Sequence, residues 1–184
     1  MKLHKLCLLS FLLIFISKIS DAQKLTSFVD PFLGTGGHGH VYPGATIPFG
    51  MVQLSPDNGE EGWDWCSGYH YSSNTIAGFS HTHLSGTGVP DYADMLIVPQ
   101  SGQAKWKGKF EDPNGYGSSF KHQDEVARLG YYEVLLQDEN ITAKLSCLER
   151  SGIHEYTFLN ANEKKYILID LNYRDKLLKG AFHI

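Results

Sequence analysis

Three prolines exclude a helix from much of the most distinctive part of this chain, the stretch between residues 34 and 94. Proline lacks the backbone N–H that a helix needs, so Pro43, Pro48 and Pro56 interrupt any helix in the first part of the stretch. The stretch is also rich in glycine, which adopts positive φ and lets the backbone approach a partner closely. It is therefore predicted to form loops and short strands.

A two-residue alternation of apolar and polar side chains indicates the fold class in the second half of the chain. Side chains of a strand point alternately to opposite faces, so Tyr132, Val134 and Leu136 would share one face. The alternation resumes at Ile141 after a turn at 138–140. Short strands separated by turns predict an all-β protein, an antiparallel β-sandwich that contains a meander. The expected strands lie at 51–54, 76–79, 94–98, around 120, and at 131–136, 141–147, 153–159 and 166–171.

The long polar connection between residues 100 and 129 contains a short alternation of lysines. Lys105, Lys107 and Lys109 are separated by single residues, one of which is Trp106. Such an alternation is most simply an edge strand that faces solvent, because charged side chains protect sheet edges. A basic binding patch is the alternative, and it is disfavoured because acidic residues follow at once.

The first 22 residues have the layout of a secretory signal peptide. Lys2 and Lys5 form a basic start, and the apolar run at 6–16 is too short to span a bilayer as a mature helix. Small residues at 20–22 suit a signal peptidase, so cleavage is expected before Gln23. A buried N-terminal helix is the disfavoured alternative.

The remaining residues, 23–184, are enough to bury one core and are expected to form one β-sandwich domain. Removing the signal peptide changes the formal charge from −4 to −6. This acidity argues against nucleic acid or an anionic membrane as a partner. Export permits a disulfide between Cys66 and Cys147, but two distant cysteines do not specify one, and free, partly buried thiols are favoured.

Three glycine-rich loops carry most of the polar chemistry of the chain. The stretch that contains them holds five of the nine histidines and two of the three tryptophans, which favours a ligand-facing surface over a set of tight turns. The apolar C–H faces of a pyranose pack against tryptophan, and its hydroxyls bond to carboxylate and imidazole groups. Each histidine could instead bond backbone groups within its own loop. The candidate substrate-binding residues are Trp63, Asp64, His38, His40, His81 and His83.

Two H-x-H pairs in these loops raise a rival hypothesis, a metal-binding β-domain. In extended backbone this spacing places both imidazoles on one face, at residues 38–40 and again at 81–83. Imidazole suits zinc, copper and iron. The pattern alone is a weak predictor, so sugar recognition is preferred.

Several short sequence motifs match a family pattern in the same order along the chain. They are Val29–Gly36, His38–His40, Tyr42–Ala45, Pro48–Asp57, Cys66–Tyr71 and Gly78–Gly88, with weaker matches at Arg150–His154 and Ile169–Leu171. On these motifs the chain resembles the N-terminal domain of glycoside hydrolase family 92, the exo-acting, calcium-dependent α-mannosidases. Several motifs of this length in the same order make the match specific.

The resemblance implies a β-sandwich that lends an aromatic wall to a pocket completed by a second, helical domain. Trp63 matches the tryptophan of that wall and Asp64 follows it, whereas Trp65 departs from the family pattern. Asp91 and Asp94 match acidic positions of the family and are weak candidates for calcium ligands, although pinning their own loop is the preferred role. No residue here matches the family's catalytic acid and base, which lie in the helical domain.

The resemblance therefore predicts the substrate-pocket domain of a secreted or periplasmic glycoside hydrolase that acts on mannose-terminated glycans by calcium-assisted inverting hydrolysis. Calcium would be bound mainly by the helical catalytic domain. The chain looks truncated inside its first domain, so this partner is expected to be missing and the chain alone to be inactive. The alternative is a free-standing carbohydrate- or metal-binding β-module.

Overall fold

The computed structural model describes residues 25–109, 111–174 and 176–180. The predicted signal peptide at 1–22 lies outside the described residues. The chain divides into two units, and in the first, which ends at Asp30, the structure describes a short 3-10 helix, η1 (Thr26–Phe28). The second unit begins at Pro31, and all that follows concerns this unit.

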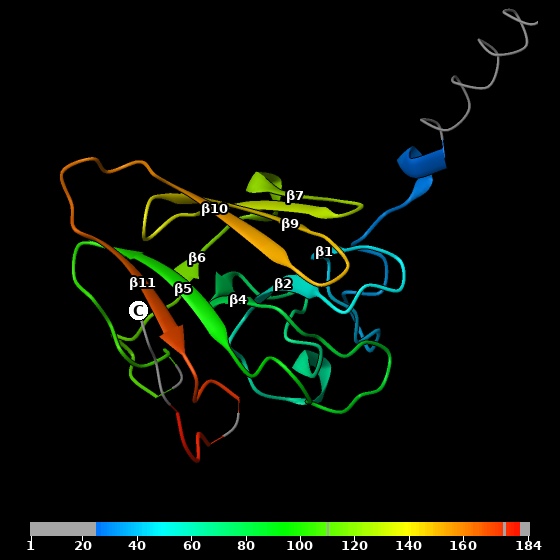
Figure 1. The fold of residues 1–184 in the computed structure, drawn as a ribbon, viewed down its shortest axis with the longest axis horizontal. Helices are drawn as coiled ribbons and strands as arrows, with labels where there is room; N and C mark the ends of the chain where they lie inside the picture. The colour runs from blue at the N-terminus through cyan, green and yellow to red at the C-terminus, as the bar shows by residue number, and fades with distance from the viewer. Residues whose placement is uncertain (1–24, 110, 175, 181–184) are drawn as a thin grey trace, which may run out of the picture. The chain divides into compact units, whose positions relative to one another are not determined.

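The second unit is built of two antiparallel sheets that lie as two layers (Figure 1). The first sheet has the order β1-β2-β4-β5-β11 and the second the order β10-β9-β8-β7. A small two-stranded ladder, β3-β6, accompanies them. The bounds are β1 Ala45–Thr46, β2 Gln53–Asp57, β3 Thr75–Ile76, β4 Gly78–Ser80, β5 Leu96–Ser101, β6 Ser118–Ser119, β7 Glu125–Arg128, β8 Tyr131–Leu136, β9 Ile141–Cys147, β10 Gly152–Phe158 and β11 Lys165–Asp170.

The main core lies between the two sheets, where their inner faces meet. Leu54 and Phe79 from the first sheet and Tyr132, Val134 and Leu145 from the second are buried in one cluster. Each large apolar side chain buried in this way contributes roughly 1.5–3 kcal/mol to folding. The alternating apolar positions of the sequence therefore become the inner face of the second sheet, and the predicted β-sandwich is confirmed.

Two predictions about single segments were wrong. The strand expected to end before Pro99 continues through it as β5, which is tolerated because β4 pairs only with Leu96 and Ile97 and leaves one side of β5 free there. The predicted edge strand at residues 105–109 does not form. Instead, the N–H of Tyr116 bonds to the carbonyl of Lys107 at 2.7 Å and closes a loop.

Long-range pairing also differs from the simple meander. β7 to β10 pair in sequence order, as a meander requires, but β11 crosses to the first sheet and pairs with β5. Cys66 and Cys147 are both free, as expected, and they are buried where only partial burial was expected. In the described part of the chain, no helix has the length and apolar character needed to cross a membrane.

Candidate functional site

The three glycine-rich loops of the sequence lie against one another. The N–H of Gly86 donates to the carbonyl of His40 at 2.7 Å, which joins the third loop to the first. His70 Nε2 donates to the carbonyl of Gly37 at 3.0 Å, which joins the second loop to the first. Segments that are far apart in the sequence therefore share one surface.

Four of the six candidate residues gather where these loops meet, and we name them the Trp63 cluster: His38, His40, Trp63 and Asp64. His38 Nδ1 lies 2.6 Å from Asp64 Oδ1. The rings of His38 and His40 lie 5.0 and 4.4 Å from the ring of Trp63, and that of His40 meets it edge-on. Trp63 and Asp64 both lie on the 3-10 helix η2 (Trp63–Trp65).

The Trp63 cluster combines an exposed rim with a buried floor. Trp63 is 59% exposed, whereas His40 is only 6% exposed. The hydrogen bond from His38 lowers the pKa of Asp64 below its ordinary value, so this carboxylate is ionised at neutral pH. His40 Nε2 is buried without a hydrogen-bond partner and lies 3.8 Å from Asp64 Oδ1. The cluster therefore offers an aromatic face beside a carboxylate acceptor.

Gly88 is a part of this site that the sequence reasoning did not single out. It has φ +67°, and a Cβ there would lie 2.7 Å from Trp63 Nε1 and 3.4 Å from His40 Cε1. Only glycine therefore allows the third loop to close over the tryptophan. The Gly86-Thr87-Gly88 motif could have indicated this residue, because paired glycines are typical of positive φ or of close approach between the backbone and a partner.

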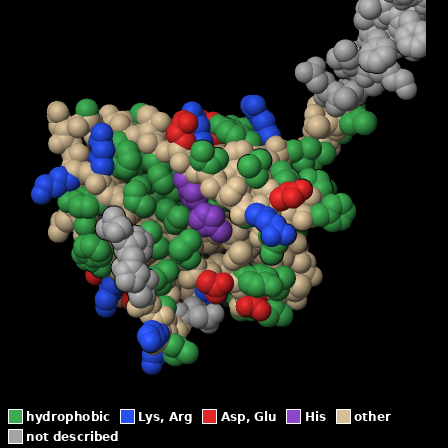
Figure 2. All heavy atoms as spheres, in the orientation of Figure 1, with side chains coloured by type: hydrophobic (Ala, Val, Ile, Leu, Met, Phe, Trp, Pro, Cys, Tyr) green, Lys and Arg blue, Asp and Glu red, His purple; other side chains and the backbone are tan. Residues whose placement is uncertain are grey.

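The other two candidate residues, His81 and His83, have different partners. His83 is 5% exposed, and its ring nitrogens lie 2.7 Å from the carbonyl of Gln53 and 3.2 Å from Asp57 Oδ1. His81 Nε2 lies 3.1 Å from His154 Nε2. Figure 2 shows histidine side chains among hydrophobic ones on the displayed face. His83 therefore ties strand β2 to its own loop within the core.

Burial keeps the His81–His154 pair neutral. Burial lowers the pKa of His81, and burial together with the neighbouring His81 lowers the pKa of His154 to about 4. His154 Nδ1 also lies 2.7 Å from the hydroxyl of Tyr156. No local sequence pattern pairs these two histidines, which are 73 residues apart.

The two H-x-H pairs do not combine into a four-histidine site. The first pair faces Asp64, while the members of the second contact His154 and Asp57 separately. Within the described ranges, no group of three or more His, Cys, Asp or Glu side chains is placed to hold a metal ion. This arrangement gives the rival metal-binding hypothesis no support.

Asp91 and Asp94 lie on the exposed loop after Gly88. Asp91 Oδ1 accepts a hydrogen bond from the N–H of Tyr92 at 2.9 Å, so it supports its own loop. The two carboxylates belong to no cluster of three possible ligands in the described part of the chain. Calcium also takes backbone carbonyls and water as ligands, so a role of Asp91 and Asp94 in binding calcium stays a prediction. Trp65 donates to Ser73 Oγ and is half-buried.

The chain is similar to known proteins in both sequence and structure. Residues 28–184 match the model of the glycosyl hydrolase family 92 N-terminal domain. A curated relative is an uncharacterized secreted glycosidase of Arthroderma benhamiae, 31% identical over 86% of this chain and 21% of its own length.

Solved family 92 enzymes share the fold. An α-mannosidase of Bacteroides thetaiotaomicron, in complex with mannoimidazole, is 46% identical and has a TM-score of 0.77 over 82% of this chain and 20% of its own. An inverting mannosidase of the same organism is 29% identical, with a TM-score of 0.67 over 79% of this chain and 19% of its own. The chain thus spans about one fifth of the length of these relatives. By the match over residues 28–184, the chain belongs to glycosyl hydrolase family 92, as its N-terminal β-sandwich domain.

Proposed function

We propose that this chain forms one wall of the substrate pocket of a secreted exo-α-mannosidase that acts on mannose-terminated glycans. Membership of the family and two mannosidases among the structural neighbours support this substrate class. One of those neighbours is an inverting enzyme, and another is bound to mannoimidazole. The name of the secreted fungal relative supports export.

The observation that carries the proposal is the Trp63 cluster. Trp63 presents an exposed aromatic face that suits the apolar C–H side of a pyranose. The ionised carboxylate of Asp64 lies beside it and can accept hydrogen bonds from two sugar hydroxyls. His38, which is already bonded to Asp64, fixes the direction of that carboxylate. The cluster therefore binds and orients a sugar.

We assign no catalytic acid or base to this chain. An inverting glycosidase needs two carboxyl groups about 6.5–9.5 Å apart with a water molecule between them. Asp64 is the sole carboxylate of the Trp63 cluster, and its low pKa makes it an acceptor, not an acid. We propose that the acid and base of the hydrolysis, and most ligands of the calcium that assists it, belong to the complete enzyme outside this chain.

The edges of the two sheets support a further covering domain. β10 and β11 are each the last strand of their sheet. On β11, the side chains of Ile167 and Ile169 lie on the same face of the first sheet as Phe79, and they are 50% and 45% exposed. Adjacent exposed apolar side chains on an edge strand are typical of a surface that another domain buries. We propose that the catalytic domain of the complete enzyme lies against this side.

A chimera tests the role of the Trp63 cluster. Residues 28–184 replace the matching segment of the 46% identical α-mannosidase, and hydrolysis of an aryl α-mannoside is measured with calcium present. Trp63→Ala should lower kcat/KM by roughly 10- to 100-fold, because sugar packing on the indole is lost. Phe49→Ala, which removes a fully exposed aromatic ring outside the Trp63 cluster, is the control and should have no effect.

Two outcomes would contradict the proposal. Unchanged turnover by a folded Trp63→Ala chimera would remove the cluster from the pocket. Release of mannose by the purified chain alone would show that the chain carries its own acid and base.

A further inference from the structure

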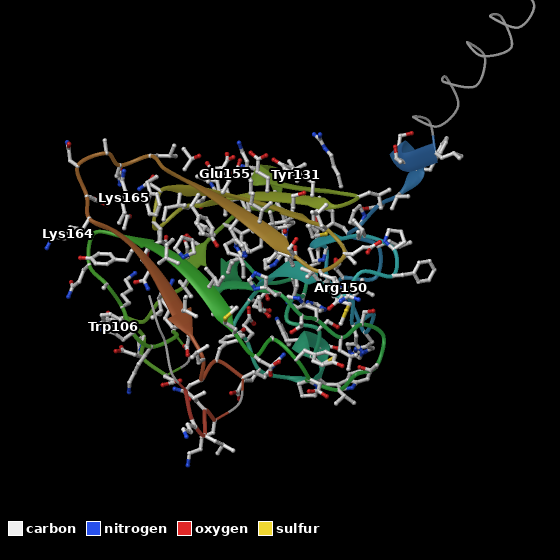
Figure 3. The ribbon with its side chains drawn as sticks, in the orientation of Figure 1. Trp106, Tyr131, Arg150, Glu155, Lys164 and Lys165 are labelled. Atoms are coloured by element: carbon white, nitrogen blue, oxygen red, sulfur yellow. The ribbon has the colours of Figure 1, made fainter. Side chains whose placement is uncertain are left out.

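Trp106 is the most exposed tryptophan of the structure. It lies on the connection between β5 and β6, at the outer surface (Figure 3), and is 74% exposed. Across the residues that the structure describes, no hydrogen bond and no ring contact holds its indole. Single exposed apolar side chains are common on soluble proteins, so the surroundings of Trp106 decide whether it belongs to a site.

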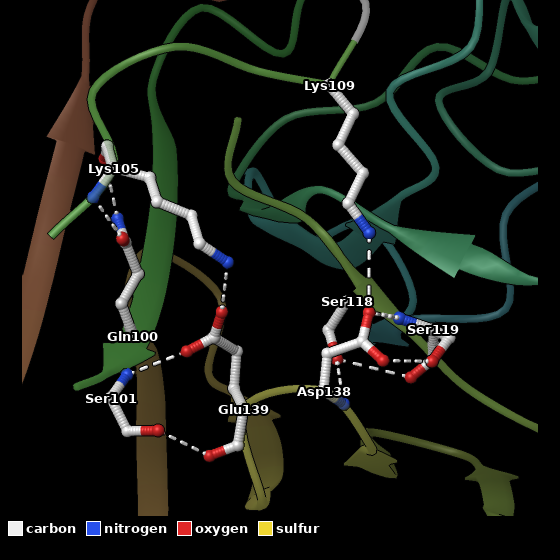
Figure 4. Close-up of polar contacts among 8 residues, drawn as sticks. All are labelled: Gln100, Ser101, Lys105, Lys109, Ser118, Ser119, Asp138 and Glu139. Carbon is white, nitrogen blue, oxygen red and sulfur yellow. Dashed lines mark hydrogen bonds and ion pairs between the residues drawn. The ribbon is translucent and has the colours of Figure 1, made fainter. Parts of the chain in front are cut away.

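The backbone on both sides of Trp106 is held in place. The buried amide of Gln100 accepts from the N–H of Lys105 at 2.7 Å and donates to its carbonyl at 3.0 Å (Figure 4). On the other side, the carbonyl of Lys107 accepts from the N–H of Tyr116 at 2.7 Å. The exposed ring therefore stands on a fixed base, which lowers the entropy that binding would cost.

Two ion pairs anchor the same loop to the turn between β8 and β9 (Figure 4). Lys105 Nζ lies 2.9 Å from Oε1 of Glu139, whose carboxylate is almost fully buried and also accepts from the N–H of Ser101. Lys109 Nζ lies 3.3 Å from Oδ2 of Asp138. These contacts come from a different sheet, so the loop is positioned by the fold and not by its own turns alone.

Trp106 borders a pocket of about 810 Å³. The polar residues that line the same pocket include Lys105, Lys107, Asp112, Asn114 and Asp138. The core of a protein–protein interface is depleted in charged residues, so this lining does not fit an apolar partner surface. A rigid aromatic face with neighbouring ammonium, amide and carboxylate groups fits a polyhydroxylated ring.

We propose that Trp106 and this pocket form a second carbohydrate-binding site, which takes one pyranose unit of a glycan. The sugar packs its C–H face on the indole, and its hydroxyls meet the polar lining. The site shares no residue with the Trp63 cluster. It rests on the proposed function only for the choice of mannose as the test sugar. Its use would be to hold a second unit of a branched or polymeric glycan.

The three tryptophans of the chain make the test direct. The indole N–H resonances of the purified chain are assigned with single Trp→Phe variants and followed by NMR during titration with α-mannooligosaccharides. We expect the resonance of Trp106 to move with saturable dependence on sugar. The resonance of Trp65, whose Nε1 donates to Ser73 Oγ at 2.8 Å, is the internal reference and should stay in place.

The result separates the two proposals. Movement of Trp63 alone would support the proposed pocket and overturn the second site. Movement of Trp106 alone would support the second site and leave the Trp63 cluster without a sugar. Movement of neither resonance up to high millimolar sugar would overturn the second site.

Variants supply the second measurement. Trp106→Ala should weaken binding of mannan by roughly tenfold, while Trp106→Phe should retain most of it, because an aromatic face remains. Phe49→Ala is the matched control and should bind as the unsubstituted chain does. Mannan binding that Trp106→Ala leaves unchanged would overturn the proposal. A Trp106→Ala chain that differs from the unsubstituted chain only in its oligomeric state would also overturn the proposal, since Trp106 would then be a contact between protein chains.

Discussion

The two H-x-H segments have the same spacing and different surroundings. In the first, the side chain of His38 is 72% exposed and bonds to Asp64 at the rim of the three loops. In the second, His83 is buried and bonds to Asp57, which is itself fully buried. His40 has φ +51°, so the first segment is not extended, and the shared spacing does not fix where its imidazoles point. The surroundings of each histidine decide whether it supports a surface or the core.

Among the substitutions that test this contrast, Asp57→Ala should change the free energy of unfolding the most. The carboxylate of Asp57 accepts from the N–H and hydroxyl of Ser80 and lies 3.2 Å from His83 Nε2. Its removal leaves these buried groups without an acceptor, so the free energy of unfolding should fall by about 3–5 kcal/mol. Urea denaturation of the purified chain, followed by tryptophan fluorescence, measures this change.

Asp64→Ala is the matched control, because it removes a carboxylate from the other histidine–aspartate pair. Asp64 lies at the surface, so the urea midpoint should stay where it is in the unsubstituted chain. A shift as large as that of Asp57→Ala would show that both pairs hold the fold together, and the contrast between them would be lost.

Acidification should lower the stability of the fold through His154, the partner of His81 in the second segment. The pKa of His154, beside His81, is lowered to about 4 from an ordinary value of 6.5. Between pH 6.5 and 4 the unfolded chain binds a proton at this position and the native chain does not, so stability falls as the pH falls. Over this interval, His154 should lower the free energy of unfolding by roughly 2–3 kcal/mol.

A neutral variant isolates this contribution. His154→Gln has no imidazole to protonate, so its stability should fall less than that of the unsubstituted chain between pH 6.5 and 4. The measurement is urea denaturation at several pH values in that interval. Parallel curves for the two chains would show that His154 is protonated in the native state, contrary to its position against His81 and Tyr156.

The second sheet could be predicted closely, because its strands pair with sequence neighbours. The alternation gave the bounds of β8 and β9, and the apolar residues Tyr132, Val134 and Leu136 are buried as expected. The pairing of β11 with β5 could not be predicted, because local patterns do not select a distant partner. The segment at 105–109 has the alternation of a strand, but the buried side chain of Gln100 takes its backbone bonds.

The site was predictable in composition and only partly in geometry. His38, His40, Trp63 and Asp64 do meet, as a shared recognition surface requires. Their role in binding sugar stays a prediction. His81 and His83 have the same residue type and spacing as the first pair, yet their contacts depend on His154 and Asp57, which the sequence did not mark as partners.

A pair of glycine variants should have the smallest effect on the free energy of unfolding. It probes the Trp63 cluster without substituting any of its members. Gly86 and Gly88 have similar positive φ values of +74° and +67°, so alanine at either should cost about 1–2 kcal/mol of backbone strain. A Cβ at Gly86 meets nothing within 4 Å, whereas one at Gly88 would lie 2.7 Å from Trp63 Nε1. Gly88→Ala alone should therefore shift the indole resonance of Trp63. Equal shifts in both variants would mean that the loop moves as a whole, and that Gly88 is not needed for the close approach to Trp63.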